Sequence, residues 1–154
     1  MPSFRSGLLV LGTLGFAAAA VAHGAPHSKA EEAIDYRHSV YHVIAWNVHR
    51  MGAQVEGKAP FDKDAFATQA ARVAVLAPML PEGFPEGSYV KGKTDAKPEL
   101  WQNRAEFDEL MKKLAAKSAA LADVAKSGDL AKIKPAFGDL TQACKNCHEK
   151  FKAD

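Results

Sequence analysis

The chain has 154 residues, which fits one domain. Its apolar fraction of 47% is enough for a real core, and its 25% of charged residues is typical of an ordinary soluble protein. A formal net charge of +2 with scattered lysines argues against nucleic acid as a partner.

The N-terminus has the pattern of a secretory signal peptide. Arg5 precedes an apolar run from Leu8 to Val21, no acidic residue occurs before position 23, and Ala20-Val21-Ala22 fits an A-x-A cleavage site. The alternative is an uncleaved membrane anchor, but the run of about 14 residues is shorter than the roughly 20 that span a bilayer. We therefore expect residues 1–22 to be removed. Residues 23–154 would form one domain in the periplasm of a Gram-negative bacterium, with no membrane segment.

Four stretches repeat apolar residues with the 3–4 spacing of a helix face, and no stretch alternates for long with the period of a strand. They predict helices within residues 34–55, 66–80, 100–125 and 130–151.

Glycine and proline mark the connections between these helices. Gly57 and Pro60 precede the cap candidates Asp62 and Asp64, and Ser127-Gly128-Asp129 makes a second short break. Pro78 and Pro81 should bend or stop the second helix, and residues 82–98 read as a long loop. Pro135 should kink the last helix or delay its regular part. Two short connections and a long one predict an all-α, antiparallel four-helix bundle.

The two cysteines of the chain lie in the motif Cys144-Lys145-Asn146-Cys147-His148. Both fall on the apolar seam of the fourth predicted helix, and His148 follows Cys144 by four residues on the same face. C-x-x-C-H is the attachment motif of c-type haem. Two thiols on one turn can each add to a porphyrin vinyl group, and the histidine then ligates the iron. The motif predicts one covalent haem c per chain, with His148 as the axial ligand.

Other readings of the two thiols are weaker. A disulfide between residues three apart on a helix would require both side chains to be redirected. A thioredoxin-like dithiol would need a preceding strand in a βαβ setting, and zinc would need further ligands, since the chain has no second cysteine pair.

The chain resembles the cytochromes c′, which are class II c-type cytochromes, from Ala30 to its C-terminus. The resemblance rests on these segments together with the haem motif: Tyr36-Arg37, Ala59-Pro60-Phe61-Asp62, Lys97-Pro98-Glu99-Leu100-Trp101 and Ala136-Phe137-Gly138-Asp139-Leu140. The family implies a four-helix bundle, a five-coordinate and largely high-spin haem, and usually an antiparallel homodimer.

The resemblance also assigns site residues. Matching Tyr36-Arg37 places Tyr41 on the distal side of the haem, where related six-coordinate proteins carry a ligating methionine. Arg37, a charge on an apolar stripe, would pair with a haem propionate. The family has a basic residue, commonly arginine, where Lys152 stands near the proximal face. Each also has a plainer interpretation: Tyr41 as a core aromatic, Arg37 as exposed or paired with a carboxylate, and Lys152 as solvated.

Further residues complete the predicted site. Trp101 and Phe107 should wall the pocket, although core packing is an alternative for Phe107. His38 is three residues before Tyr41 and could reach the haem rim as a second histidine ligand, whereas His42 and His49 fall off the stripe and should be solvated.

The expected function is binding of nitric oxide and carbon monoxide, with a role in nitric oxide sequestration or transport. The alternative is an electron carrier that cycles between ferric and ferrous iron with an unknown redox partner. A haem enzyme such as a peroxidase is not expected, because it needs a distal acid–base pair. The homodimer expected from the family would use apolar positions off the haem stripe, such as Val40, Val43 and Val75.

Overall fold

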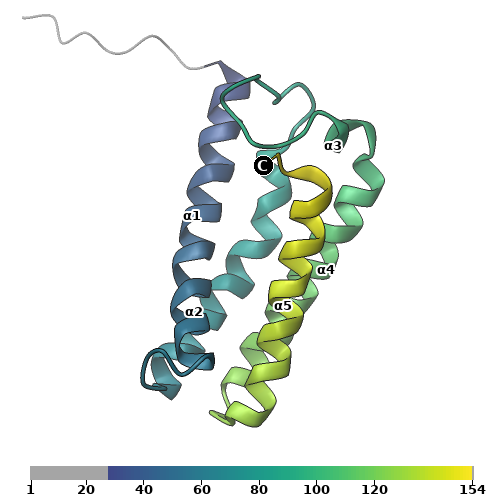
Figure 1. The fold of residues 1–154 in the computed structure, drawn as a ribbon. Coiled ribbons are helices and arrows are strands. Elements are labelled where there is room, and N and C mark those ends of the chain that lie inside the picture. Colours follow the sequence, from purple (N-terminus) through teal and green to yellow (C-terminus); the bar gives the residue numbers. More distant parts are fainter. Residues whose placement is uncertain (1–27, 154) are drawn as a thin grey trace, which may run out of the picture.

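The computed structural model describes residues 28–153, and the predicted signal peptide lies outside them. Four long helices form an up-down-up-down bundle, which confirms the predicted all-α fold (Figure 1). The elements in chain order are α1 (Lys29–Val55), α2 (Lys63–Leu76), η1 (Ala77–Gly83), α3 (Glu99–Gln102), α4 (Arg104–Ala125) and α5 (Leu130–Phe151).

Side-chain caps begin three of the four long helices. Ser28 and Glu31 form a capping box at the start of α1. Of the two cap candidates before α2, Asp62 is the cap, and its carboxylate accepts hydrogen bonds from the amides of Asp64 and Ala65. Asp129 caps α5 by accepting from the amide of Ala131 at 2.9 Å. These caps satisfy amide groups that the first turn of a helix leaves free.

The prolines act differently in the two helices that carry them. Pro78 and Pro81 coincide with the change from α2 to the tighter η1, as the sequence predicts. Pro135 does not delay α5, because Asp129 caps the helix upstream and the carbonyl of Asp129 accepts from the amides of Lys132 and Ile133. Of the two expected effects of Pro135, the later start is therefore wrong, and the kink stays a prediction.

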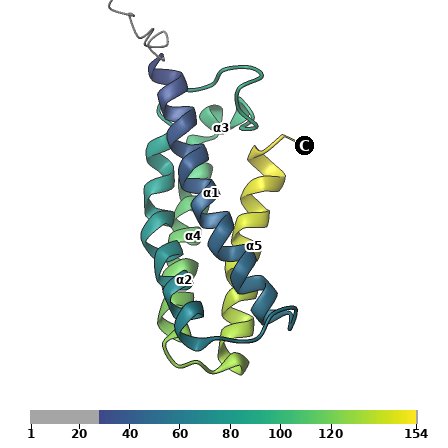
Figure 2. The same ribbon diagram turned by 90° about the vertical axis from the view of Figure 1, so that its left-hand side faces the viewer.

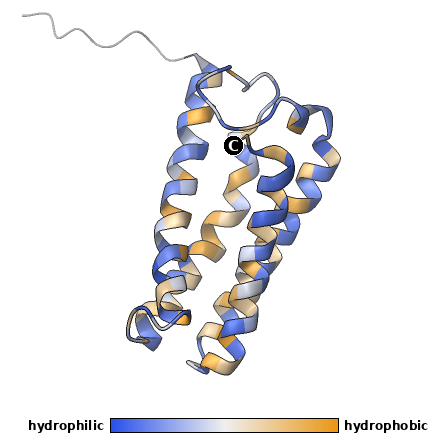
Figure 3. Ribbon diagram, in the orientation of Figure 1, coloured by the Kyte–Doolittle hydropathy of each residue, from blue (hydrophilic) through white to orange (hydrophobic). Residues whose placement is uncertain are grey.

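The bundle core is built from the apolar faces of all four long helices. Figure 3 shows hydrophilic and hydrophobic residues sharing each helix, as an amphipathic bundle requires. The core includes these fully buried side chains: Met51, Phe66, Val73, Leu80, Phe107, Leu121, Ile133 and Leu140. In Figures 1 and 2, α1 and α5 come together at the end that carries the short connections and diverge toward the other end.

Residues 84–98, which we call the pocket loop, lie over the end of the bundle where α1 and α5 diverge (Figure 2). Two backbone hydrogen bonds join the loop to the end of α5. The Lys97 amide donates to the carbonyl of Phe151 at 2.8 Å, and the Ala153 amide donates to that of Asp95 at 2.7 Å. Together they make an isolated antiparallel bridge between Ala96 and Lys152.

One of the three valines proposed for a dimer interface is in the core. Val40 is 7% exposed and belongs to the hydrophobic cluster, so it is unavailable to a partner, and its inclusion was wrong. Val43 and Val75 are 47% and 69% exposed. The helical period explains the difference, because Val40 shares the inward face of α1 with Ile44.

Gly83→Ala should destabilise the fold. A Cβ on Gly83 would lie 2.5 Å from the Cβ of Arg37 and 3.1 Å from its Cα, so η1 and α1 would have to separate. Overpacking of this kind costs about 1–3 kcal/mol. Urea unfolding measures the loss. Gly138→Ala is the control, because its added Cβ meets nothing within 4 Å, and the exposed helical site should gain about 0.5–1 kcal/mol. Equal stability of the two variants would contradict the close approach.

Glu31 should make part of the stability depend on pH. Its carboxylate pairs with Lys93 of the pocket loop and accepts from Ser28, and these bonds lower its pKa from 4.5 to about 2. A lowered folded-state pKa gives stability that is present above pH 4.5 and is lost as the pH falls toward 2. Glu31→Gln should therefore be less stable than the wild type at pH 6, and the difference should vanish near pH 2. A difference that stays constant across this range would rule out the carboxylate as its source.

Candidate functional site

A cavity of about 250 Å³ lies between α1, α5 and the pocket loop. Its walls are mostly apolar, and its polar groups come from α1, from the pocket loop and from the end of α5. The lining residues are Arg37, His38, Tyr41, Ala45, Phe84, Thr94, Asp95, Ala96, Leu100, Phe107, Cys147, His148, Phe151 and Lys152. An apolar pocket with a few convergent polar groups is the usual form of a cofactor site.

The haem motif contributes one wall of the cavity from the last turns of α5. Cys147 and His148 line it directly, and Cys144 is half-buried one turn earlier. No disulfide joins the two cysteines, so both sulfurs are available to bond to another group. Burial raises the pKa of Cys147 to about 11, which keeps this thiol protonated at neutral pH.

The imidazole of His148 is suited to binding a metal. Desolvation lowers its pKa, and the nearby charge of Lys152 lowers it further, so the neutral form is favoured. A neutral imidazole offers a nitrogen lone pair to a metal. His148 itself is exposed at the cavity edge, which leaves it accessible to a bound group.

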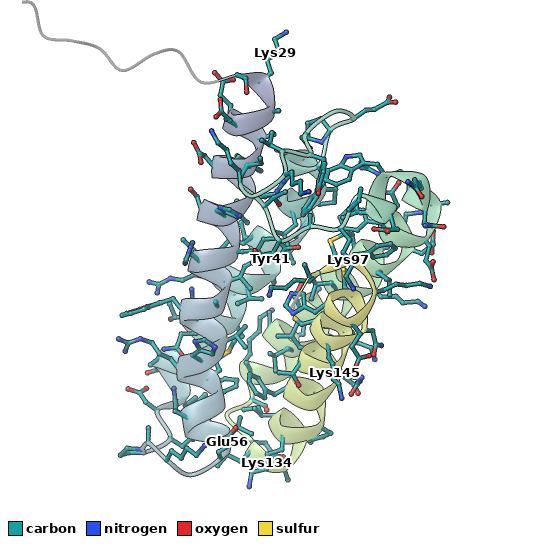
Figure 4. All side chains as sticks on the ribbon, turned by 45° about the horizontal axis from the view of Figure 1, so that its top comes forward. Lys29, Tyr41, Glu56, Lys97, Lys134 and Lys145 are labelled. Atoms are coloured by element: carbon teal, nitrogen blue, oxygen red, sulfur yellow. The ribbon has the colours of Figure 1, made fainter. Side chains whose placement is uncertain are left out.

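Tyr41 lies on the wall formed by α1 and projects toward the α5 side (Figure 4). Its ring meets that of Phe84 edge-on, with centroids 6.4 Å apart. Burial raises the pKa of its phenol above the ordinary value of 10. The side chain therefore stays neutral, and a neutral phenol is a poor ligand for iron.

Arg37 is a buried cation beside the cavity, with 1% of its surface exposed. Its guanidinium donates to the carbonyl of Gly83 at 2.9 Å, to the hydroxyl and carbonyl of Ser88 at 3.2 and 3.1 Å, and to the hydroxyl of Thr94 at 2.8 Å. All four hydrogen-bond acceptors given by the described residues are uncharged. A buried cation among neutral acceptors favours an anionic group nearby. The predicted pairing with a haem propionate stays a prediction, and a protein carboxylate is not among these acceptors.

Of the two aromatics predicted to wall the pocket, one lines the cavity and the other lies behind the lining. Phe107 is fully buried and lines the cavity. Trp101 is not among the lining residues. It packs behind Phe84, with centroids 6.3 Å apart, because its indole nitrogen donates to the carbonyl of Pro85 at 2.9 Å and holds the ring in that position.

Phe84 and Phe151 are the lining aromatics that were not assigned to the site from the sequence. Phe84 packs on Phe107 with centroids 4.9 Å apart. It follows η1 in an irregular loop, so no periodicity marked it. Phe151 carried a usable signal, because it follows Cys147 by four residues on the same face of α5.

The remaining candidates lie at the cavity rim or outside it. His38 is exposed and lines the edge on α1, whereas His42 and His49 are exposed and outside the lining, as expected. Lys152 also lines the rim. Its ammonium donates to the carbonyl of Ala153 at 3.3 Å and lies 3.8 Å from a carboxylate oxygen of Asp95.

The donor set fits a haem better than a bare metal ion. Within residues 28–153, no group of three or more histidine, cysteine or acidic side chains could hold a metal ion. The cavity offers aromatic walls for a flat apolar ring, a buried cation for a carboxylate, and the thiol of Cys147 beside the imidazole of His148. The second thiol, Cys144, lies one turn earlier on the same helix. These are the functions that a covalently attached haem requires of a protein.

Comparisons with known proteins point to one family. A family model described as cytochrome C′ matches residues 32–152. A cytochrome c′ from Rubrivivax gelatinosus is 40% identical over 124 residues, which cover 80% of this chain and 96% of that one. A solved cytochrome c prime from Shewanella frigidimarina is 42% identical with a TM-score of 0.79, covering 84% of this chain and all of that one. A nitric oxide complex of a variant cytochrome c prime from Alcaligenes xylosoxidans is 29% identical with a TM-score of 0.76, covering 84% of this chain and all of that one.

Proposed function

The chain belongs to the cytochrome c′ family and carries covalent haem c, and on this basis we propose that it binds small gases in the periplasm. Cys144 and Cys147 would hold the haem through thioether bonds, and His148 would ligate its iron from the proximal side. Arg37 would pair with a propionate. The haem supplies an iron that can take a diatomic ligand on its other face.

The observation that carries this proposal is the position of Tyr41, which lines the α1 side of the cavity while His148 lines the α5 side. The phenol of Tyr41 is uncharged, and no methionine is among the lining residues that the structure describes. An iron without a second strong protein ligand keeps an exchangeable position. Tyr41 and Phe84 would then select by size, admitting nitric oxide or carbon monoxide and excluding larger molecules.

A solved relative supports gas as the ligand class. The cytochrome c prime variant from Alcaligenes xylosoxidans is a nitric oxide complex. For the present chain we propose nitric oxide sequestration or transport. Catalysis is not proposed, because it would need a distal acid–base pair. The guanidinium of Arg37 already donates four hydrogen bonds to η1 and the pocket loop, so His38 would have to act without a partner.

Electron transfer is the second candidate. His38 lines the cavity rim, and ligation by it would give a six-coordinate iron suited to electron exchange with a redox partner. The exposure of His38 weighs against this, because the side chain would have to turn inward past Tyr41.

The electronic and resonance Raman spectra of the purified holoprotein distinguish the two functions. We expect high-spin, five-coordinate iron that binds carbon monoxide upon reduction. Low-spin six-coordinate iron in both oxidation states would overturn gas binding and favour the carrier.

Tyr41→Ala should speed carbon monoxide binding to the ferrous protein. Removing the ring lowers the steric barrier, and a reduction of about 1.4 kcal/mol gives a tenfold faster association rate. Stopped-flow or flash photolysis measures the rate. His42→Ala is the matched control, because His42 is the next residue on α1 and lies exposed outside the cavity. An unchanged rate in Tyr41→Ala would mean that the tyrosine does not guard the site.

We further propose a homodimer that buries the outer face of α1 and α2. Val43, Trp46 and Val75 are exposed there by 47%, 61% and 69%. The guanidinium of Arg50 lies 4.1 Å from the centroid of the Trp46 ring, which adds a cation–π contact to the same face. A solved cytochrome c′ that is 29% identical is described as having an unusual ligand-controlled dimer dissociation.

Trp46→Glu should shift the protein from dimer to monomer, because a charge would replace the largest exposed apolar side chain of this face. Analytical ultracentrifugation over a range of concentrations measures the dimer dissociation constant, which should rise by tenfold or more. Tyr89→Glu is the control, since Tyr89 is also an exposed aromatic but lies on the pocket loop. An equal effect of both substitutions would contradict an α1–α2 interface.

Periplasmic location remains part of the proposal. It rests on the predicted signal peptide at residues 1–22. The helices within residues 28–153 include none that is long and apolar enough to cross a membrane.

A further inference from the structure

Thr94 lies at a junction between the two helices that face each other across the cavity. Its hydroxyl oxygen accepts from Nη2 of Arg37 at 2.8 Å and from the amide of Ala96 at 3.1 Å. The residue is half-buried and lines the cavity. One oxygen thus joins a side chain of α1 to the backbone of the pocket loop.

The α1 side of this junction is held by several further contacts. The guanidinium of Arg37 is buried and also bonds Gly83 and Ser88, and it stacks 4.8 Å from the centroid of the Phe84 ring. Arg37 precedes Tyr41 by four residues, so the two share a face of α1 one turn apart. Whatever holds Arg37 in place therefore also affects the region of α1 that carries the distal tyrosine.

The other side of the junction leads to the haem motif. Immediately after Thr94, residues 95–97 pair with residues 151–153 through the two backbone hydrogen bonds of the Ala96–Lys152 bridge. The Lys152 amide in turn donates to the carbonyl of His148 at 3.0 Å. The loop segment is thus bonded to the turn of α5 that carries His148.

We propose that Thr94 is a positioning residue for ligand entry: its hydroxyl oxygen holds the pocket loop to Arg37 and so fixes the width of the cavity mouth between α1 and the last turn of α5. Gly83 at the end of η1 and Ser88 in the loop accept from Arg37. Lys93 of the loop also pairs with Glu31 of α1, and Thr94 adds the contact with Arg37 directly before the segment that is bonded to α5. Without it, residues 95–97 would stay attached to α5 but would lose this link to α1.

The physical cost of losing the oxygen is large for a single atom. Without this oxygen, one N–H of the buried Arg37 guanidinium and the amide of Ala96 each lose a hydrogen-bond acceptor. A hydrogen bond to a charged group contributes more than a neutral one, and leaving a buried donor without a partner adds a desolvation penalty. The loop should therefore open more often.

Thr94→Val tests the proposal in the full-length holoprotein, because valine keeps the branched shape and removes the oxygen. Hydrogen exchange at the amides of Lys97 and Ala153 should become about tenfold faster, as expected for the loss of one charged hydrogen bond. Carbon monoxide association with the ferrous protein should also be faster, by about threefold or more, since the mouth opens more readily. Thr94→Ser, which retains the oxygen, should restore both rates to within about twofold of the wild type.

The matched control is Thr141→Val. The hydroxyl of Thr141 donates to the carbonyl of Gly138 within α5, away from the cavity, so its loss should leave both amides and the association rate unchanged. If Thr94→Val does not fold, Thr94→Ala removes the same oxygen and is measured in the same way.

Two outcomes would overturn the proposal. Unchanged exchange at Lys97 and Ala153 in the valine variant would show that Thr94 does not hold the loop. Faster exchange with an unchanged association rate would show that the loop does not control entry. The measurement of carbon monoxide association rests on the proposed gas binding. If the wild-type protein does not bind carbon monoxide, that function fails, while hydrogen exchange at Lys97 and Ala153 still tests the role of Thr94.

Discussion

The positive charge of Arg37 is the constraint around which the cavity end of this molecule is organised. The guanidinium is withdrawn from water and must find acceptors, because an unsatisfied buried charge would cost far more than a bundle of this size can offset. η1 and the pocket loop provide the four oxygens described above. The path of the irregular pocket loop brings Ser88 and Thr94 to the arginine, and the end of η1 brings the carbonyl of Gly83. The close approach of Gly83 to Arg37 is part of the same arrangement.

The loop, in turn, decides what kind of cavity the bundle has. Four packed helices alone would fill their own centre with side chains. Here α1 and α5 diverge and the loop covers the gap, which leaves a space with aromatic walls and charges at its edge. Such a space suits a flat, largely apolar group with a charged margin. On the α1 side of this space, Tyr41 and Phe84 present ring edges and faces but no charge.

Much of the fold and part of the site could be predicted from the sequence, and the division has a physical basis. The four helices follow from periodicity, and the anchoring motif follows from spacing within one helical turn. The pocket loop is irregular, so nothing in its sequence showed that Phe84 would line the cavity or that Trp101 would pack behind it. The charge of Arg37 pointed to a partner but could not show that four neutral oxygens would surround it. Long-range contacts of this kind depend on chain geometry that local patterns do not contain.

The pairing of residues 151–153 with the pocket loop has a practical consequence for work on this protein. Because Phe151 and Ala153 both bond to the loop, residues 151–153 lie beside the cavity mouth rather than at a remote surface (Figure 1). A purification tag or fusion partner attached directly after these residues would emerge beside Lys152 and crowd the entrance. Kinetic measurements made on such a fusion would report the tag as well as the pocket. Protein without an addition at this point is therefore the appropriate material for ligand-binding studies.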